Sequence, residues 1–402
     1  MIGTVERPRA GVNFASPVLA IVLCAILVSL CSYTRVLAAD SVELKHVEVT
    51  QSVQDASNSV PMIAGKRTFV RAFLDYTASA PAQKVRGTIE LRRPTGAVLT
   101  IDSMSTVATL LDPALNGKLD AKRKVLDQSL VFEIPVDWTS VGDLSVSLNM
   151  VTLDNGVHLM CAKCDEKTTI RFGQAAPARI VLLGMRYTRG GKTFVPRDID
   201  YKSIVSWVRR AYPAPEFEFQ TRVVDWTNAP PIFDDGLVSC GKANAVITAF
   251  RKLDLSIGKN ALFHYYGVVY DDGSSLGNFM RGCSSVPPNP DPSAVGSGPA
   301  GVGLYPWDKS PSFAGWYAGH ELGHTYGRHH PISGCGDLDE NGGDLQWPAN
   351  MPKNKLGTAA HPYVAFDSGD ASIPAPMSVL GWDLAADLMT YCDHVWPRSP
   401  SR

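Results

Sequence analysis

The histidines of this chain are concentrated at one place. Residues 320–330 read HELGHTYGRHH, which contains the pattern H-E-x-x-H-x-x-G-x-x-H. Residues four apart share one face of a helix, so His320 and His324 can present two imidazoles to a single ion. Gly327 can adopt a positive φ and turn the chain, which lets His330 complete a three-histidine site. Such a site leaves one coordination position for water and suits Zn²⁺, so these histidines are the predicted metal ligands.

A carboxylate follows the first histidine directly. Glu321 is one step around the helix from His320, beside the metal but off the ligand face, where it can take a proton from water. This combination predicts metal-assisted hydrolysis. Two alternatives remain open. His329 could replace His330 as the third ligand, or Cys335 could close the fourth position of a purely structural zinc site, which would have no use for the carboxylate.

The composition narrows the classes of protein that remain. The chain has 402 residues, with 38 Lys plus Arg against 39 Asp plus Glu and a net charge of -1, which argues against nucleic acid as a partner. Apolar residues make up 45% and charged residues 19%, as in a folded chain long enough for about two domains. Neither a P-loop nor a G-x-G-x-x-G pattern occurs, so a nucleotide cradle is not expected.

The first residues predict export. Two arginines precede the apolar stretch 18–30, and the short side chains at 36–39 suit a signal peptidase. We therefore expect residues 1–38 to be a signal peptide and the mature protein to be secreted, in a periplasmic or extracellular compartment. An uncleaved membrane anchor over 14–33 is the alternative; after cleavage no membrane contact is expected.

The residues that follow the leader look like strands. Apolar and polar residues alternate at 130–134 and 144–150, while 69–74 is almost continuously apolar and fits a strand buried on both faces. Short strands separated by turns predict an Ig-like antiparallel β-sandwich over 40–173. This half shows no clustering of potential metal ligands, so a structural or docking role is expected for it.

Beyond a linker at 174–178 the pattern becomes mixed. Continuous apolar runs predict buried strands, and apolar residues at helical spacing predict helices, in the alternating order of a mixed α/β layer. The expected strands are 179–187, 216–224 and 261–270, and the expected helices are 200–211, 242–253 and the motif-bearing 313–326.

The extended histidine motif resembles the metzincin clan of zinc endopeptidases. The second hallmark of that clan is a Met-turn beneath the metal, and Asp387-Leu-Met-Thr-Tyr-Cys392 matches it, with Met389 as the floor of the site. In astacin-like and serralysin-like members a tyrosine two residues after this methionine helps to stabilise the transition state. The resemblance therefore implies that Tyr391 is a catalytic residue together with Glu321. The wider context WYAGHELGHTYGRHHP is similar to secreted bacterial metzincin-like proteins.

The resemblance implies a fold class and an activity. The expected class is α+β: the N-terminal antiparallel β-sandwich, followed over 178–402 by a metzincin-like zinc peptidase domain with a mixed sheet, an active-site helix and a Met-turn. The implied function is a secreted zinc-dependent endopeptidase with Zn²⁺ as cofactor and a protein or peptide as substrate. The alternative is a surface module that binds glycan or protein and carries a catalytically silent zinc domain. No G-G-x-G-x-D repeats follow, so a serralysin calcium domain is not expected.

Six cysteines remain after the leader, an even number that fits three disulfides in an exported protein, although 15 connectivities are possible. A bridge between Cys335 and Cys392 would tie the Met-turn of the resemblance to the chain that follows the motif. Cys240 with Cys283 is the next choice, which leaves Cys161 with Cys164. The last pair could instead bind zinc, or one of its thiolates could block the metal site and keep the protein latent.

Overall fold

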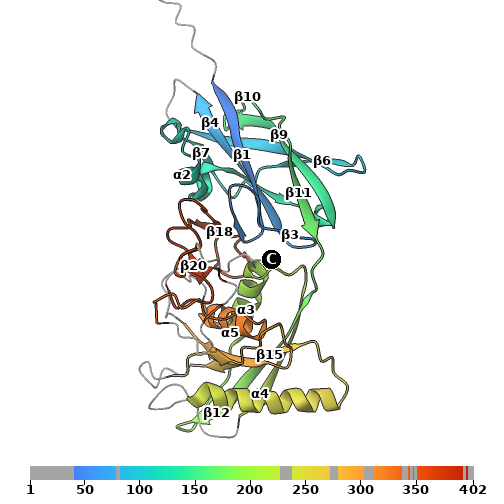
Figure 1. Cartoon of the computed structure of the whole chain (residues 1–402), viewed down its shortest axis with the longest axis vertical. Coiled ribbons are helices and arrows are strands. Elements are labelled where there is room, and N and C mark those ends of the chain that lie inside the picture. The colour runs from blue at the N-terminus through green and yellow to red at the C-terminus, as the bar shows by residue number, and fades with distance from the viewer. Residues whose placement is uncertain are drawn as a thin grey trace, which may run out of the picture.

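The computed structural model describes residues 40–77, 82–226, 238–271, 279–302, 311–336, 343–344, 347, 351–392 and 395–396. The predicted signal peptide lies outside these residues. The molecule is elongated, with the sheets of the first half at one end and helix α4 (Val238–Ser256) at the other (Figure 1). None of the helices in the described part of the chain is long and apolar enough to span a bilayer.

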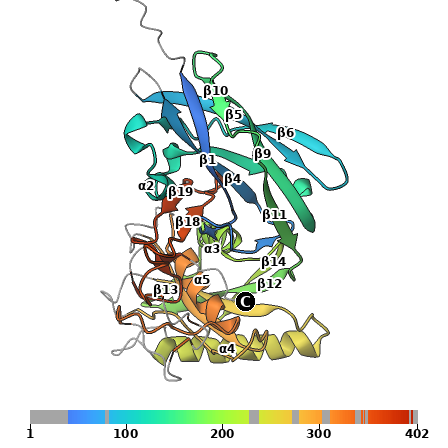
Figure 2. The ribbon, with the colours of Figure 1, turned by 45° about the horizontal axis from the view of Figure 1, so that its top comes forward.

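The first half consists of two sheets that share one core (Figure 2). The first sheet has the order β10-β1-β4-β8, formed by Met160–Ala162, Ser41–Thr50, Thr68–Thr77 and Leu130–Ile134. The second has the order β3-β11-β9-β5-β6, formed by Met62–Ile63, Thr168–Gly173, Gly142–Leu153, Gln83–Arg92 and Val98–Asp102, and β7 (Thr109–Leu111) pairs with β5. Pairing is antiparallel except between β1 and β10 and between β3 and β11.

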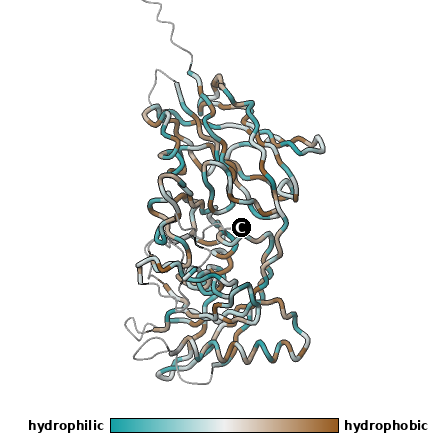
Figure 3. The backbone as a smooth tube through the Cα atoms, in the orientation of Figure 1, coloured by the Kyte–Doolittle hydropathy of each residue, from teal (hydrophilic) through white to brown (hydrophobic). Residues whose placement is uncertain are grey.

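The alternating sequence of these strands explains the shared core. Along β9, Leu144, Val146 and Leu148 are buried and contribute to the core, while the serines between them are less buried. Brown and teal segments accordingly alternate along these strands in Figure 3. Short helices lie between the strands: α2 (Leu119–Arg123) and the 3₁₀ turns Pro113–Leu115, Leu126–Gln128 and Val136–Thr139.

The second half is built on one sheet with helices on both faces. Its strands β14, β12, β15 and β17 are parallel neighbours, β16 is antiparallel to β17 at the edge, and β13 pairs with the end of β12. Their bounds are Phe217–Asp225, Ala178–Arg189, His264–Tyr270, Val295–Ala300, Cys283–Ser284 and Lys192–Phe194 respectively. Helices α3 (Asp198–Ala211) and α5 (Ala314–Thr325) cover one face, and α4 covers the other.

Continuously apolar strands suit this arrangement because both faces of the sheet are buried. On β12, Ile180 and Leu182 pack with α3 and α5, while Val181 and Leu183 pack with α4. The predicted strand and helix positions in this half are confirmed to within a few residues, apart from the longer α4.

The C-terminal segment joins the two halves. Strand β18 (Val364–Asp367) pairs with β19 (Ser378–Leu380) and also with β2 (Val53–Gln54) of the first half. Phe366 packs on Phe69 with ring centroids 5.0 Å apart, so β4 is buried on both faces, as its sequence predicted. A short parallel pair, β20 (Ala386–Asp387) and β21 (Val395–Trp396), follows.

The predicted metzincin-like α+β fold class is wrong. Strands hold 39% of the described residues and helices 19%, several sheets are present, and the helix that carries the histidines is only 12 residues long. The segment after the motif was assigned to the peptidase domain over 178–402, but its β18 completes a sheet with β2 of the first half. The motif dictates a helix and a turn locally, and such a unit does not determine the sheets around it.

Candidate metal centre

Helix α5 presents the first two histidines to one point. Ala314, Ala318 and Leu322 face the sheet core, and His320 and His324 lie four residues apart on another face of the helix. Their Nε2 atoms lie 3.0 Å and 3.1 Å from Nε2 of His330. The ligand atoms of the three histidines all lie within 4.8 Å of one another, so the group could hold a metal ion.

Close packing against α3 holds this helix in place. Gly315 and Gly319 lie directly against Trp207: a Cβ on Gly319 would overlap the indole, and a Cβ on Gly315 would lie 2.8 Å from Cβ of Trp207. The hydroxyl of Tyr212, just after α3, donates to the backbone oxygen of Gly319. These contacts leave α5 little freedom to slide or rotate, so the spacing of the first two histidines is fixed by packing as well as by helix geometry.

The helix ends where the sequence predicted. Gly327 has a φ of 79°, and a Cβ there would lie 3.0 Å from the backbone of Asn289. The amide of Gly327 donates to the oxygen of His324, and the amide of Arg328 donates to the oxygen of Gly323, which is the Schellman arrangement. The turn reverses the chain and brings His330 back to the helix.

Backbone carbonyls orient the two helical histidines. Nδ1–H of His320 donates to the oxygen of Leu388 at 2.9 Å, and Nδ1–H of His324 donates to the oxygen of Arg328 at 2.7 Å. These bonds direct each Nε2 lone pair into the site. Burial, with the nearby His330, lowers the pKa of His320 to about 3, and burial lowers that of His324 well below its usual value. Both imidazoles are therefore neutral at pH 7, as metal ligation requires.

The spacing of the three nitrogens fits a tetrahedral metal. Nitrogens bound at ~2.0–2.1 Å from a tetrahedral Zn²⁺ lie ~3.3 Å from one another. The Nε2 separations of 3.0 Å and 3.1 Å are close to that value. The set of three imidazole nitrogens therefore fits an ion that accepts nitrogen ligands.

The third member of the group is His330, not His329. Cys335 forms a disulfide with Cys392 and does not supply a fourth ligand. The other bridges join Cys240 to Cys283 and Cys161 to Cys164. All three favoured pairs are thus present, and no thiolate from them is available to bind or block a metal.

The Met-turn residues lie beside the histidines. Met389 is buried beneath α5, where a Cβ on Gly323 would lie 2.6 Å from its Sδ. The ring centroid of Tyr391 lies 5.4 Å from that of His320 and 5.1 Å from that of His330, and its side chain is 48% exposed. Met389 is therefore part of the packing under the helix, whereas Tyr391 is accessible from solvent next to the metal group.

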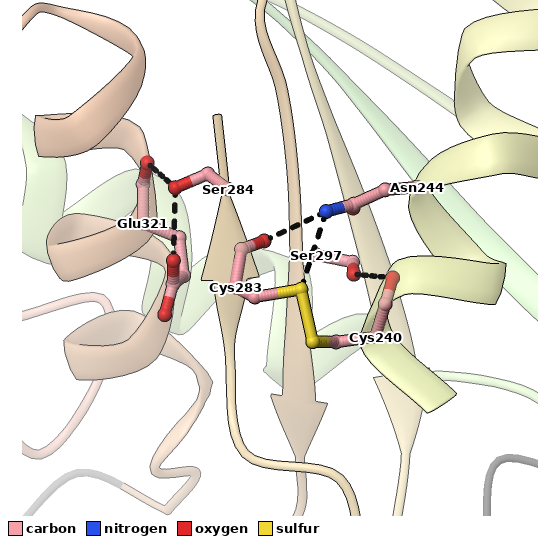
Figure 4. The surroundings of a disulfide bond; sticks show 6 residues. All are labelled: Cys240, Asn244, Cys283, Ser284, Ser297 and Glu321. Carbon is pink, nitrogen blue, oxygen red and sulfur yellow. Dashed lines mark hydrogen bonds between the residues drawn. A yellow bond between two sulfur atoms is a disulfide. The ribbon is translucent and has the colours of Figure 1, made fainter. Parts of the chain in front are cut away.

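Glu321 is buried against strand β16 (Figure 4). The hydroxyl of Ser284 lies 2.9 Å from Oε2 of Glu321 and 2.8 Å from its backbone oxygen. Burial raises the pKa of Glu321 to about 8, and the bond from Ser284 opposes that rise. Sequence reasoning missed Ser284, because 37 residues separate it from Glu321 and no local pattern connects them.

No protein-family model matches the chain, and no curated protein matches it. Among solved structures it is similar to a calcium-binding mutant of Bacteroides uniformis β-glucuronidase 2, with 8% identity and a TM-score of 0.15. The similarity covers 57% of this chain and 25% of the glucuronidase, so the chain spans about a quarter of that protein's length. A similarity this low identifies neither the family nor the fold.

Proposed function

We propose that this protein is a secreted zinc-dependent endopeptidase. The observation that carries the proposal is the convergence of three imidazole nitrogens on one point, with a buried carboxylate on the residue after the first ligand. Structural zinc sites normally close all four positions with Cys or His. The metal group in the described part of the chain contains three ligands, which favours a catalytic site with one open position.

Zinc is the metal that this donor set suits best. Three imidazoles offer borderline nitrogen ligands, whereas Ca²⁺ and Mg²⁺ prefer oxygen. When bound, Zn²⁺ supplies a Lewis acid that polarises a peptide carbonyl and makes water a nucleophile near neutral pH.

The surrounding side chains have distinct roles in the proposed reaction. Glu321 takes a proton from the attacking water and returns it to the departing amine. A pKa raised by burial suits that task, because the carboxylate is more basic than one in water. Tyr391 donates a hydrogen bond to the developing oxyanion from its position beside His320 and His330. Met389 supports the helix from below.

The disulfides support the secreted part of the proposal. Three bridges fit an oxidising, extracellular compartment, because the cytosol keeps most thiols reduced. Export through the leader at 1–38 then gives a mature chain that begins at Ala39. N-terminal sequencing of the exported protein tests whether the mature chain begins at Ala39.

The proposal is tested by two measurements on one sample of the mature protein. The first is a casein cleavage assay, and the second is an analysis of the metal content. We expect one zinc per chain, cleavage that 1,10-phenanthroline stops and added Zn²⁺ restores, and a Glu321→Ala variant that keeps zinc but does not cleave. Glu218→Ala, at an exposed ion pair, is the matched control and should cleave normally. A zinc-loaded wild type that leaves casein and a peptide library intact would instead favour a binding module with a silent site.

A further inference from the structure

Gly282, Ser284 and Gly296 are close neighbours of the Glu321 side chain. Ser284 contacts both Oε2 and the backbone oxygen of Glu321, at 2.9 Å and 2.8 Å. One hydroxyl therefore links the side chain to the main chain of the same helical residue. This pair of contacts restricts rotation of the carboxylate relative to α5.

The two glycines leave just enough room for this contact. A Cβ on Gly282 would overlap Oε1 of Glu321. A Cβ on Gly296 would lie 3.0 Å from Cβ of Ser284 and 3.4 Å from Cβ of Glu321. A side chain at position 282 would therefore displace the carboxylate, and one at position 296 would crowd Ser284.

The strand that carries Ser284 is tethered on its other side. β16 is two residues long and pairs with β17 through Cys283 opposite Ser297 and Ser284 opposite Gly296. Cys283 is also bonded covalently to Cys240 of α4. Asn244 of α4 donates from Nδ2 to the oxygen of Cys283 at 3.0 Å (Figure 4). A short edge strand would otherwise be easy to displace, so these links give Ser284 a defined position.

We propose that Ser284 is the positioning residue for Glu321, held in place by the Cys240–Cys283 bridge. Its hydroxyl contacts Oε2 and the backbone oxygen of the same residue, which fixes the direction of the carboxylate relative to α5. The inference rests on the proposed function and deepens it, because it says which side chain orients the base. A preorganised base avoids the loss of rate that a freely rotating carboxylate would bring.

The kinetic test compares Ser284→Ala with Ser284→Thr in the zinc-loaded mature protein. For the alanine variant we expect kcat to fall about ten-fold with KM within about two-fold of wild type, since the lost contact acts on orientation and not on substrate binding. Threonine keeps the hydroxyl and should restore at least half of kcat. Ser293→Ala, which removes an exposed serine bonded to Asp291, is the matched control and should leave kcat unchanged. Zinc content and thermal midpoint are measured for every variant.

An unchanged kcat in Ser284→Ala would overturn the proposal. So would a loss that appears in KM alone, or a folded, zinc-loaded threonine variant as slow as the alanine variant. A second arm tests the tether by replacing both Cys240 and Cys283 with alanine. We expect a smaller loss of kcat than in Ser284→Ala and none when Cys161 and Cys164, at a remote bridge, are replaced in the same way.

Crystal structures of the wild type and of Ser284→Ala provide a readout that does not depend on activity. We expect one ordered conformer of the Glu321 carboxylate in the wild type and a displaced or spread carboxylate in the variant. An unmoved, ordered carboxylate in the variant refutes the positioning role even if wild type is an active peptidase. A displaced carboxylate in a protein that cleaves nothing supports the positioning role while the peptidase proposal fails.

Discussion

Two polar centres in this molecule differ in what their polar atoms face. In the first half, Glu48 lies between Arg71 and Arg123, and all three side chains are 1% exposed or less. Arg71 donates to Oε1 of Glu48 at 3.1 Å and Arg123 to Oε2 at 2.6 Å. Other N–H groups of the same two guanidinium groups donate to the hydroxyl of Ser129 and to backbone oxygens, including that of Pro362.

The candidate metal centre is less enclosed, because His330 is only partly buried, and it is bonded differently. His320 and His324 are 2% and 5% exposed, and each uses Nδ1 on a backbone oxygen. Their Nε2 atoms converge on that of His330 at 3.0 Å and 3.1 Å, a set of nitrogens close enough together to ligate one cation. A buried network of paired charges stabilises the fold, whereas imidazole nitrogens that converge on one point mark a candidate site for a ligand.

Removal of one of the three converging imidazole nitrogens should have the largest effect, on both zinc binding and cleavage. In His324→Ala we expect the zinc content to fall from one per chain to below about 0.1, because one of three ligands is gone, and casein cleavage to fall to background. Metal analysis after dialysis and a cleavage assay measure both. His361→Ala, at an exposed histidine, should retain zinc and activity. Full zinc content in His324→Ala would remove the basis of the comparison.

Breaking the buried network of paired charges should act on stability alone. Glu48→Ala leaves two buried guanidinium groups without their carboxylate, and we expect the free energy of unfolding to fall by about 3–5 kcal/mol. Urea denaturation, monitored by circular dichroism, measures this free energy of unfolding. The folded variant should still bind one zinc. The control is Glu90→Ala, at an exposed ion pair with Arg92, which should lower the free energy of unfolding by less than about 1 kcal/mol. A change in zinc affinity of the folded Glu48→Ala variant would contradict the separation of roles.

A third buried polar group, His264, should make the stability of the fold depend on pH. His264 is 4% exposed, Nδ1 lies 2.9 Å from Oγ1 of Thr325, and burial lowers its pKa to about 4. The unfolded chain, with a histidine pKa of about 6.5, binds more protons than the folded chain between pH 6.5 and 4. Stability should therefore fall by up to about 3 kcal/mol as the pH drops through that range.

The His264→Gln variant should lose this part of the pH dependence. Thermal denaturation of the metal-free wild type and variant at pH 4, 5 and 7 provides the comparison, since zinc binding would add its own pH dependence. Parallel pH profiles for the two proteins would show that His264 does not titrate as its burial implies.

The smallest expected effect concerns the exposed tyrosine. Tyr391→Phe should lower kcat about ten-fold, less than the 10²–10³ typical of an enclosed oxyanion donor, because Tyr391 is 48% exposed. KM and zinc content should stay close to the wild-type values. Steady-state kinetics on a peptide substrate measures the effect. A variant with wild-type kcat would assign Tyr391 to packing beside the histidines and not to the reaction.

Local features of the chain were predictable because the physics that produces them is local. The pattern from His320 to His330 predicted a helix, a glycine turn with positive φ and a third histidine, and each is present. The pairing of Cys335 with Cys392 was anticipated from the family resemblance and is also present. The same resemblance failed for the fold class, because eleven residues of motif say little about how sheets assemble around them.

The three-histidine group that could hold a metal ion, the adjacent carboxylate and the alternation of strands and helices were all predictable from the sequence, since side-chain spacing along one helix and apolar periodicity are properties of contiguous residues. Three other contacts came from the tertiary fold: β18 completes a sheet with β2, Arg123 donates to the oxygen of Pro362, and Ser284 contacts Glu321. Each of these contacts joins residues far apart in the chain. They depend on how whole sheets and helices pack, and no local pattern encodes that.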